Sequence, residues 1–539
     1  MVRRCIVVLV LISVSLAVGQ KSVKRSHDEA NLEGVTKEQL FDYLSFIASD
    51  ELEGRDTPSR GLNIAAKFIA THLSRWGYTP AGDSGSFFQK ILLHKTRVVP
   101  EQSTVTVGGR TFSFGSDFIS QAITGNSTAP MVYVKNGYIV NSLSINPYAG
   151  IDVKGKIMIV TEGYPKGVTR GDFGQKLGED YDTPSNYAKN NGAAGIILIP
   201  SAKTLQRWET EKNSVTMKGT LSVPALKKQD VKGPVPYVTA SHALVEAIFA
   251  GENIGVQTMT EKSAADSARS FDLSPTKKLS MSIAVRTDSL YSQNIVAVKP
   301  GSDKKLKDEY VAFGAHYDHI GIRPEPVNGD SIYNGADDDG SGTVGLLSIA
   351  EAMAKGPAAK RSILFVWHMG EEKGLWGSKY FVQNPTVPLS NIVTQLNIDM
   401  IGRSKPDTGE ASKNEEYSRP NELFSIGSNM MSTELGKMND QVNASLYNMK
   451  LNYKYDDPSD PNKLFYRSDH YNYARMGIPI VFYFDGIHED YHRVSDEVSK
   501  IDFTKLMKVT RTIYALGWKI ANLPHRPVVD KKFSREEID

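Results

Sequence analysis

The chain has almost no cysteine. Its 539 residues contain one, Cys5, which lies in a short apolar segment at the amino terminus. The rest of the chain therefore has no disulfide framework, no cysteine nucleophile and no thiolate metal ligand, and any metal must be held by His, Asp and Glu. Long apolar runs are also lacking after this first segment, so no later membrane span is expected.

An excess of charge of either sign is lacking as well. Lys and Arg total 63 and Asp and Glu total 61, which gives a formal net charge of +2. A basic face for nucleic acid is therefore not expected. The length of 539 residues, with 40% hydrophobic and 23% charged residues, predicts an ordinary globular protein of two or three domains.

The amino terminus has the layout of a secretory signal peptide. Arg3 and Arg4 precede an apolar run from Cys5 to Val18, and Gly19 follows. We predict that residues 1–19 are a signal peptide and that the protein is secreted or periplasmic, without stable membrane insertion after cleavage. A membrane anchor is the alternative reading, but a span needs about 20 apolar residues.

Patterning divides the remaining chain into three regions and a charged tail at 526–539. Residues 20–103 contain two helix patterns, one of which starts with a capping box at Thr36 and Gln39. Residues 104–260 contain short β-rich runs between turns, without paired carboxylates or metal-ligand spacing, and are predicted to form a β-rich inserted domain.

Residues 261–525 alternate between buried strands and amphipathic helices. This alternation predicts an α/β domain with a mixed, mostly parallel central sheet flanked by helices. The strand candidates are Asn294–Val298, Tyr310–Ala315, Ser362–Trp367, Val393–Ile398 and Ile478–Phe484. The helix candidates are Gly342–Lys355, Leu375–Val382 and Phe503–Leu523.

Histidines and carboxylates follow several of these strands, at the sheet edge where open α/β sheets bind ligands. His316 and Asp318 follow the strand that ends at Ala315, and residues two apart in extended chain face the same way. The imidazole can bind a metal while the carboxylate orients it. A glycine-rich turn then presents three adjacent carboxylates, Asp337 to Asp339, which repel one another unless a cation compensates them.

Later strand ends add Glu371, Glu372, Asp399 and His492. Two adjacent glutamates supply a metal ligand and an uncoordinated general base. Each motif alone is often structural or a solvated loop. Together they supply two imidazoles and enough carboxylates for two Zn²⁺ without any cysteine, which fits a hydrolytic site.

In order, the motifs H-x-D, G-A-D-D-D-G-S-G, G-E-E-x-G-L-x-G-S, N-I-D-M and Y-H-x-x-x-D resemble those of a known family. It is the di-zinc exopeptidase family of secreted bacterial aminopeptidases and glutamate carboxypeptidase II. The segment from Leu44 to Arg55 is typical of its members, and residues 104–260 resemble a protease-associated domain.

The resemblance implies an aminopeptidase that acts on peptides with two Zn²⁺ per chain. The implied metal ligands are His316 and Asp399 for one ion, Glu372 and His492 for the other, and Asp338 as the bridge. Glu371 is excluded from the ligands and is the implied general base. Asp318 would orient His316, and Tyr491 would donate to the oxyanion. The Asp338–Asp339 peptide is often cis in such enzymes.

Other functions of the same fold remain open. A carboxypeptidase or dipeptidase would use a cation such as Arg403 or Arg467 to bind the terminal carboxylate. Glutaminyl cyclase uses one zinc, and a binding protein would have lost ligands or the base; the complete set argues against both. His319, His368 and His488 match no ligand role and are predicted to be structural, and an oligomer is possible.

Overall fold

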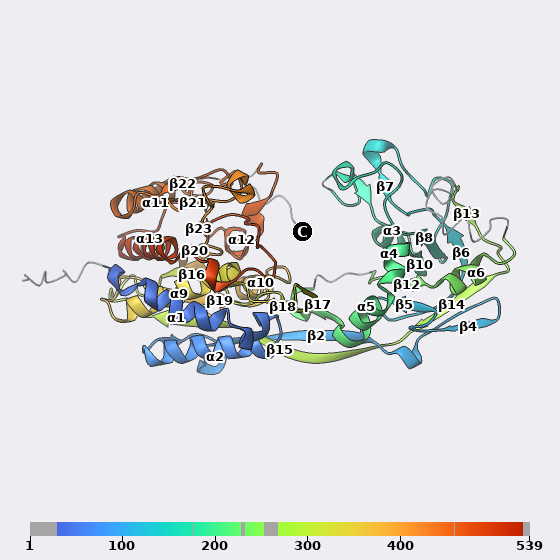
Figure 1. Ribbon diagram of the computed structural model, residues 1–539, viewed down its shortest axis with the longest axis horizontal. Coiled ribbons are helices and arrows are strands. Elements are labelled where there is room, and N and C mark those ends of the chain that lie inside the picture. Colours follow the sequence, from blue (N-terminus) through green and yellow to red (C-terminus); the bar gives the residue numbers. More distant parts are fainter. Residues whose placement is uncertain (1–29, 175, 228–231, 253–267, 458, 532–539) are drawn as a thin grey trace, which may run out of the picture.

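The computed structural model describes residues 30–531 except 175, 228–231, 253–267 and 458. The predicted signal peptide at 1–19 and the end of the predicted tail lie outside the described residues. Two lobes lie side by side, and two long strands, β2 (Phe88–Val98) and β15 (Val285–Lys299), run between them (Figure 1). Within the described ranges, no helix is both long enough and apolar enough to cross a membrane.

The first lobe is built on a ten-stranded mixed sheet in the order β11-β2-β15-β19-β16-β20-β23-β21-β22, with β1 paired to β15. Four neighbouring strands, β19, β16, β20 and β23, are parallel. Besides β2 and β15, the strands are β1 (Thr79–Pro80), β11 (Thr220–Ser222), β16 (Tyr310–His316), β19 (Ser362–His368), β20 (Ile392–Ile398), β21 (Glu422–Ile426), β22 (Lys450–Asn452) and β23 (Ile480–Phe484). The predicted α/β fold with a mixed sheet is confirmed.

Helices cover both faces of this sheet. They are α1 (Lys37–Ile47), α2 (Arg60–Arg75), α9 (Gly342–Ala354), α10 (Trp376–Gln383), α11 (Thr433–Leu446), α12 (His470–Ala474) and α13 (Phe503–Asn522). The helix predicted after Thr36 is confirmed, because the Thr36 side chain accepts a hydrogen bond from the backbone N–H of Gln39 at 3.2 Å.

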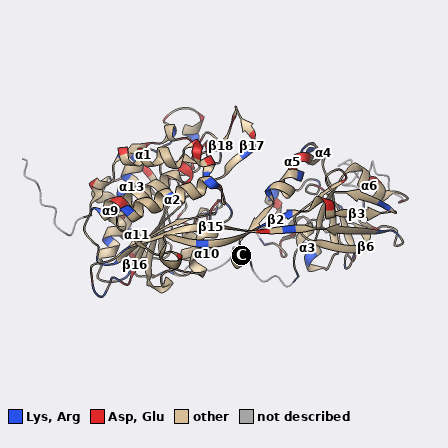
Figure 2. Ribbon diagram, turned by 90° about the horizontal axis from the view of Figure 1, so that it is seen from below, with Lys and Arg blue, Asp and Glu red and all other residues tan. Residues whose placement is uncertain are grey.

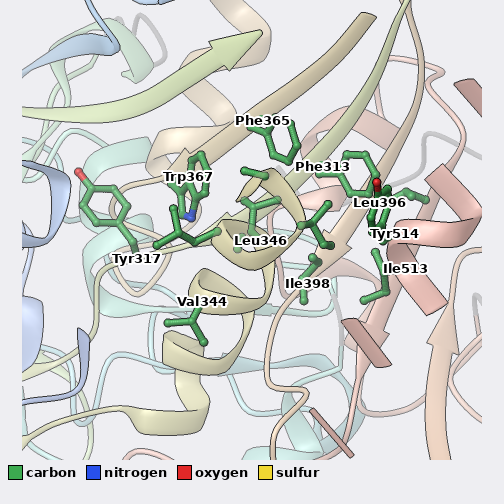
Figure 3. Packing of buried hydrophobic residues seen from close by; sticks show 14 of the residues in the cluster. Phe313, Tyr317, Val344, Leu346, Phe365, Trp367, Leu396, Ile398, Ile513 and Tyr514 are labelled. Atoms are coloured by element: carbon green, nitrogen blue, oxygen red, sulfur yellow. The ribbon is translucent and has the colours of Figure 1, made fainter. Parts of the chain in front are cut away.

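The central strands are apolar on both sides because both faces are covered. In β19, Ile363, Phe365 and Trp367 pack in one cluster, and Leu364 and Val366 pack in another. Successive side chains of a strand point to opposite faces, so the two clusters lie on opposite sides of the sheet. The first contains residues of α1, α2, α9, α11 and α13, and the second contains residues of α10 and α12. Figure 3 shows part of the first cluster, packed around α9.

The second lobe contains a nine-stranded sheet in the order β4-β3-β14-β6-β8-β10-β12-β5, with β13 paired to β6. Its strands are β3 (Thr104–Val107), β4 (Arg110–Ser113), β5 (Phe118–Ser120), β6 (Gly125–Tyr133), β8 (Ile157–Thr161), β10 (Gly195–Ile199), β12 (Tyr237–Ala240), β13 (Phe271–Asp272) and β14 (Lys278–Ile283). Its helices are α3 (Pro184–Asn190), α4 (Ala202–Gln206), α5 (Trp208–Asn213) and α6 (His242–Phe249).

Two small ribbons complete the fold. In the first lobe, β17 (Gly321–Val327) pairs with β18 (Asp330–Tyr333), and in the second β7 (Ile139–Val140) pairs with β9 (Tyr181–Asp182). In the view of Figure 2, Lys and Arg are interspersed with Asp and Glu along the ribbons of both lobes.

The two lobes are joined through an antiparallel ribbon. β2 and β15 pair from Phe88 opposite Ile295 to Val98 opposite Val285. The chain enters the second sheet at Thr104 and leaves it at Ile283. Strands β13 and β14 therefore come after residue 260. The boundaries at 103 and 260, and the protease-associated character of the insert, stay predictions.

Candidate metal centre

The predicted site residues gather at one edge of the first sheet. Parallel strands present their carboxyl ends together, so residues that are far apart in sequence meet there. His316 ends β16, and Asp399 directly follows β20. Glu371 and Glu372 lie in the turn after β19, and His492 lies in the loop after β23. All five are brought into one cluster.

The acidic turn lies at the centre of this cluster. Residues Ala336–Ser341 form an irregular turn before α9, and the Asp338–Asp339 peptide is cis, as the resemblance implied. Gly342 begins α9 where the chain passes very close to its neighbours. A Cβ there would lie 2.5 Å from the carbonyl oxygen of Ile398 and 2.2 Å from Asp339 Oδ1. Glycine is therefore required at this position for the turn to reach the strand end.

The three adjacent aspartates avoid repulsion because they point to different partners. Asp337 accepts a hydrogen bond from the backbone N–H of Gly402 at 2.7 Å, and its other oxygen lies 3.2 Å from His488 Nε2. Asp339 accepts backbone N–H groups from His316, Gly342 and Met400 at 2.9–3.1 Å. Both Asp339 oxygens are thus occupied by backbone N–H groups, whereas the Asp338 carboxylate faces His316 and His492.

The Asp338 carboxylate faces two imidazoles. Its Oδ1 lies 3.3 Å from His316 Nε2, and its Oδ2 lies 3.1 Å from His492 Nε2. Asp399 Oδ1 lies 3.5 Å from His316 Nε2, and Glu372 Oε2 lies 3.1 Å from His492 Nε2. Two groups of donors therefore share one carboxylate, which is the arrangement that the resemblance implied.

Hydrogen bonds fix these side chains in place. His316 Nδ1 donates to the backbone carbonyl of Asp318 at 3.1 Å, which leaves Nε2 free to face Asp338 and Asp399. Ser468 Oγ donates to Asp399 Oδ2 at 2.6 Å, which leaves Oδ1 on the His316 side. Asp318 therefore orients His316 through its backbone carbonyl oxygen. The Asp318 carboxylate lies farther from His316 Nδ1, at 3.7 Å.

The Asp318 carboxylate instead positions Glu371. Asp318 Oδ1 accepts the backbone N–H of Glu371 at 3.1 Å, and Oδ2 accepts the hydroxyl of Thr57 at 3.1 Å. The Glu371 side chain is 12% exposed, and its Oε2 lies 3.9 Å from His316 Nε2. Burial and nearby carboxylates hold the pKa of Glu371 well above its usual range. A raised pKa makes a carboxylate a stronger proton acceptor.

A cavity opens beside the two groups of donors. It is lined by Asp338, Glu371, Asp399, Met400, Leu464, Arg467, Ser468, Phe482, Phe484, Ile487 and Tyr491. The ring of Tyr491 stacks on His492 with centroids 3.9 Å apart. Burial raises the pKa of Tyr491 above its usual value, so the phenol stays protonated and can donate a hydrogen bond.

The two arginines considered as binding partners for a substrate carboxylate differ in exposure and in pairing. Arg403 is buried, and its Nη2 donates to Asp490 at 2.8 Å, so this cation is already paired. Arg467 is exposed and lines the cavity, where Nη2 lies 3.5 Å from the Tyr491 hydroxyl. Arg467 therefore remains available to a substrate, and Arg403 does not.

Two of the three histidines predicted to be structural lie outside the two groups of donors. His368 Nε2 lies 3.0 Å from the Tyr473 hydroxyl, and His488 faces Asp337. His319 differs, because its Nδ1 lies 2.8 Å from Glu372 Oε1 and 3.7 Å from Asp338 Oδ2. Sequence reasoning set this residue aside, since its spacing from His316 gives no direction to a side chain in a loop.

Arg55 is a second residue whose role the sequence did not reveal. It is fully buried and donates to the carbonyl oxygens of Tyr317, Ile47, Asn334 and Gly335 at 2.6–3.0 Å. Its guanidinium therefore ties the loop after β16 to the loop before the acidic turn. The only signal in the sequence is that Arg55 ends the segment that resembles the family.

The donor set fits divalent cations. His316 Nε2, Asp338 Oδ2 and Glu372 Oε1 are buried without a hydrogen-bond partner, and each such group costs about 1–3 kcal/mol when left unpaired. Two sets of three residues could each hold an ion, because within each set one ligand atom per residue lies within 4.8 Å of the other two. The sets are His316, Asp339 and Asp399, and His319, Asp338 and Glu372. Both Asp339 oxygens already accept backbone N–H groups, so Asp338 is the better ligand beside His316.

Comparison with known proteins agrees with this geometry. Residues 294–517 match the model of Peptidase family M28. A "Probable zinc metalloprotease" of Pyrenophora teres f. teres is 26% identical over 264 residues, which are 43% of this chain and 52% of the relative. A "Probable leucine aminopeptidase" of Trichophyton verrucosum is 26% identical over 237 residues, which are 42% of this chain and 57% of the relative. The chain thus spans just over half the length of these curated relatives.

A solved structure covers more of the chain. An aminopeptidase from Aneurinibacillus sp. strain AM-1 matches with a TM-score of 0.52 at 18% identity, over 94% of this chain and 98% of that one. At this identity the match shows a shared fold. The match to the model of Peptidase family M28 covers residues 294–517, which include every residue predicted for the site, from His316 to His492.

Proposed function

We propose that the chain is a zinc-dependent exopeptidase, an aminopeptidase that removes N-terminal residues from peptides with the help of two Zn²⁺. The position of Asp338 carries this proposal. One carboxylate that faces two imidazoles at 3.1–3.3 Å is suited to bridging two cations. The names of the curated relatives, a zinc metalloprotease and a leucine aminopeptidase, support the same metal and activity.

The residues fit two ions. His316, Asp338 and Asp399 would hold one, and Asp338, Glu372 and His492 would hold the other. Nitrogen and oxygen ligands without sulfur are typical of hydrolytic zinc sites. When bound, zinc polarises the substrate carbonyl and lowers the pKa of a water molecule.

Glu371 is the proposed general base. It lines the cavity, and its backbone is fixed by Asp318, so its carboxylate can take a proton from the attacking water. Glu371 can then hold the transferred proton and deliver it to the peptide nitrogen as that nitrogen leaves. The protonated phenol of Tyr491 lines the same cavity and can donate to the carbonyl oxygen as it gains negative charge.

The charge of the site favours the amino end of a peptide. Six carboxylates surround the cluster: Asp318, Asp338, Asp339, Glu371, Glu372 and Asp399. Three of them, Asp338, Glu371 and Asp399, line the cavity, and a terminal ammonium group would pair with their oxygens that are not bound to metal. Met400, Leu464, Phe482, Phe484 and Ile487 make one wall apolar, which favours an apolar N-terminal side chain.

Carboxypeptidase or dipeptidase action is the second candidate, and Arg467 is the observation that favours it. Within the described residues Arg467 forms no ion pair, and it lines the cavity. Its guanidinium could therefore bind a terminal carboxylate in bidentate fashion. The two candidates require opposite ends of the substrate to be free.

A peptide panel with blocked ends separates them. The purified protein would be given short peptides with free, N-acetylated or C-amidated ends. We expect hydrolysis to need a free amino terminus and to tolerate the amide. Cleavage of the acetylated peptides that needs a free carboxylate would favour the second candidate, and Arg467→Gln should then raise KM. No hydrolysis of any peptide would contradict both.

We also propose that the chain is exported, on the basis of the pattern in residues 1–19. Amino-terminal sequencing of the protein recovered from outside the cytoplasm should give a first residue near Gln20. Recovery of the full chain with Met1 from the cytoplasm would contradict export.

A further inference from the structure

His319 is the most poorly satisfied histidine in the described part of the chain. Its side chain is fully buried, and neither ring nitrogen has a hydrogen-bond partner. The other buried histidines, His316, His368, His470 and His488, each have one ring nitrogen in a hydrogen bond. A buried, unpaired imidazole is costly, so a missing partner is expected at this position.

The unpaired Nδ1 atom of His319 points into the group of donors around His492. It lies 2.8 Å from Glu372 Oε1 and 3.7 Å from Asp338 Oδ2. Glu372 Oε1 is itself buried without a hydrogen-bond partner, so the short distance between the two atoms is not an aligned hydrogen bond. Two unpaired donor atoms that face each other are instead arranged as two ligands of one ion.

The distances agree with a common centre. Ligand atoms about 2 Å from one zinc ion lie about 3–3.5 Å from one another in a tetrahedral site. His492 Nε2 lies 3.1 Å from both Asp338 Oδ2 and Glu372 Oε2, within this range. His319 Nδ1 lies 3.7 Å from Asp338 Oδ2 and 2.8 Å from Glu372 Oε1, slightly above and slightly below it. The rings of His319 and His492 approach edge to face with centroids 5.8 Å apart.

We infer that His319 is a metal ligand, through Nδ1, to the ion held by Asp338, Glu372 and His492. This inference rests on the proposed function, since it assumes that the ions bind. It makes the two positions unequal: one has a single imidazole, His316, and the other has two. The position with two imidazoles and two carboxylates should bind zinc more tightly and lose it later to a chelator.

Metal binding to the full chain tests the inference without relying on activity. The variant is His319→Gln, which removes the imidazole and keeps a polar side chain of similar size. The matched control is His470→Gln, which removes a fully buried imidazole whose Nε2 bonds to the carbonyl oxygen of Phe465 at 2.7 Å. Zinc affinity is measured by competition with a coloured chelator, and the number of imidazoles per zinc by X-ray absorption.

We expect X-ray absorption to show three imidazoles bound to the two zinc ions of the wild-type protein. The His319→Gln protein should show two imidazoles bound to its two zinc ions. One of the two zinc affinities should fall about 10–100-fold in that variant, and the His470→Gln protein should keep both. Two imidazoles for two ions in the wild type, or unchanged affinities in His319→Gln, would overturn the role of His319 alone. A wild-type protein that binds no zinc would overturn this inference together with the proposed function.

Discussion

The two lobes contain similar sheets, but different side chains follow the carboxyl ends of their parallel strands. Each has four neighbouring parallel strands: β19, β16, β20 and β23 in the first lobe, and β6, β8, β10 and β12 in the second. In the first lobe these strands end in histidines and carboxylates. In the second, Lys135 and Asn136 follow β6, Glu162 follows β8, Ser201 follows β10, and Ser241 and the exposed His242 follow β12. The topology therefore provides an edge in both lobes, and the residues at the edge determine what it can bind.

Burial of charge separates the lobes even more clearly. Among the described residues of 104–283, the buried polar side chains are Ser120 and Asn136, both uncharged. The first lobe buries Asp318, Asp337 and Asp339 completely, with many other charged residues. Burying a charge is costly unless it is paired or binds a metal. A concentration of buried acids at one strand edge thus indicates a site, and an apolar core indicates packing alone.

Replacing the proposed general base should have the largest effect. Glu371→Gln removes the group that accepts the proton but keeps the side-chain shape, so we expect kcat to fall about 10²–10⁴-fold. Zinc content should stay at the wild-type value, because Glu371 is not a proposed ligand. A variant with full zinc content and an unchanged rate would contradict the assignment.

Removing a proposed ligand should instead affect the metal. Glu372→Ala takes away the carboxylate 3.1 Å from His492 Nε2, and we expect one of the two ions to be lost during dialysis. The matched variant is Glu162→Ala, which removes a glutamate at the end of β8 in the second lobe. Elemental analysis should show full zinc content there. Equal zinc content in both variants would contradict the proposed difference in metal binding between the two sheet edges.

A core substitution in the second lobe should show the smallest effect on catalysis. Ile197 of β10 is fully buried, and truncating it to alanine typically costs about 2–5 kcal/mol of unfolding free energy. We expect denaturant unfolding to show this loss while kcat per bound zinc changes little. A large fall in kcat at full zinc content would show that the second lobe contributes directly to the reaction.

The sequence predicted the central elements because their signals are local. β16, β19 and β20 are continuous apolar runs between turns, and the Thr36 cap marks the start of α1. β15 proved longer than predicted, Val285–Lys299 instead of Asn294–Val298, because its first half pairs with β2 outside the apolar core. That half is polar, so its strand character comes from its partner and not from its own pattern.

The spatial proximity of the candidate residues was predictable where a motif fixes the spacing along a strand or turn. His316, Asp338, Glu372, Asp399 and His492 meet as the motifs implied. His319, Arg55 and Ser468 were not identified. Their contacts depend on the paths of loops that are distant in sequence, such as the contact between Ser468 and Asp399. No short-range pattern encodes such a contact.

The central claim is that the acidic edge of the first sheet is a two-zinc hydrolytic site. The most direct test is elemental analysis of the purified wild-type protein, combined with peptide hydrolysis before chelation, after it, and after zinc is returned. The account predicts two zinc ions per chain, loss of hydrolysis on chelation and recovery with zinc. A protein that contains no stoichiometric metal, or that hydrolyses peptides equally well after its metal is removed, would contradict it.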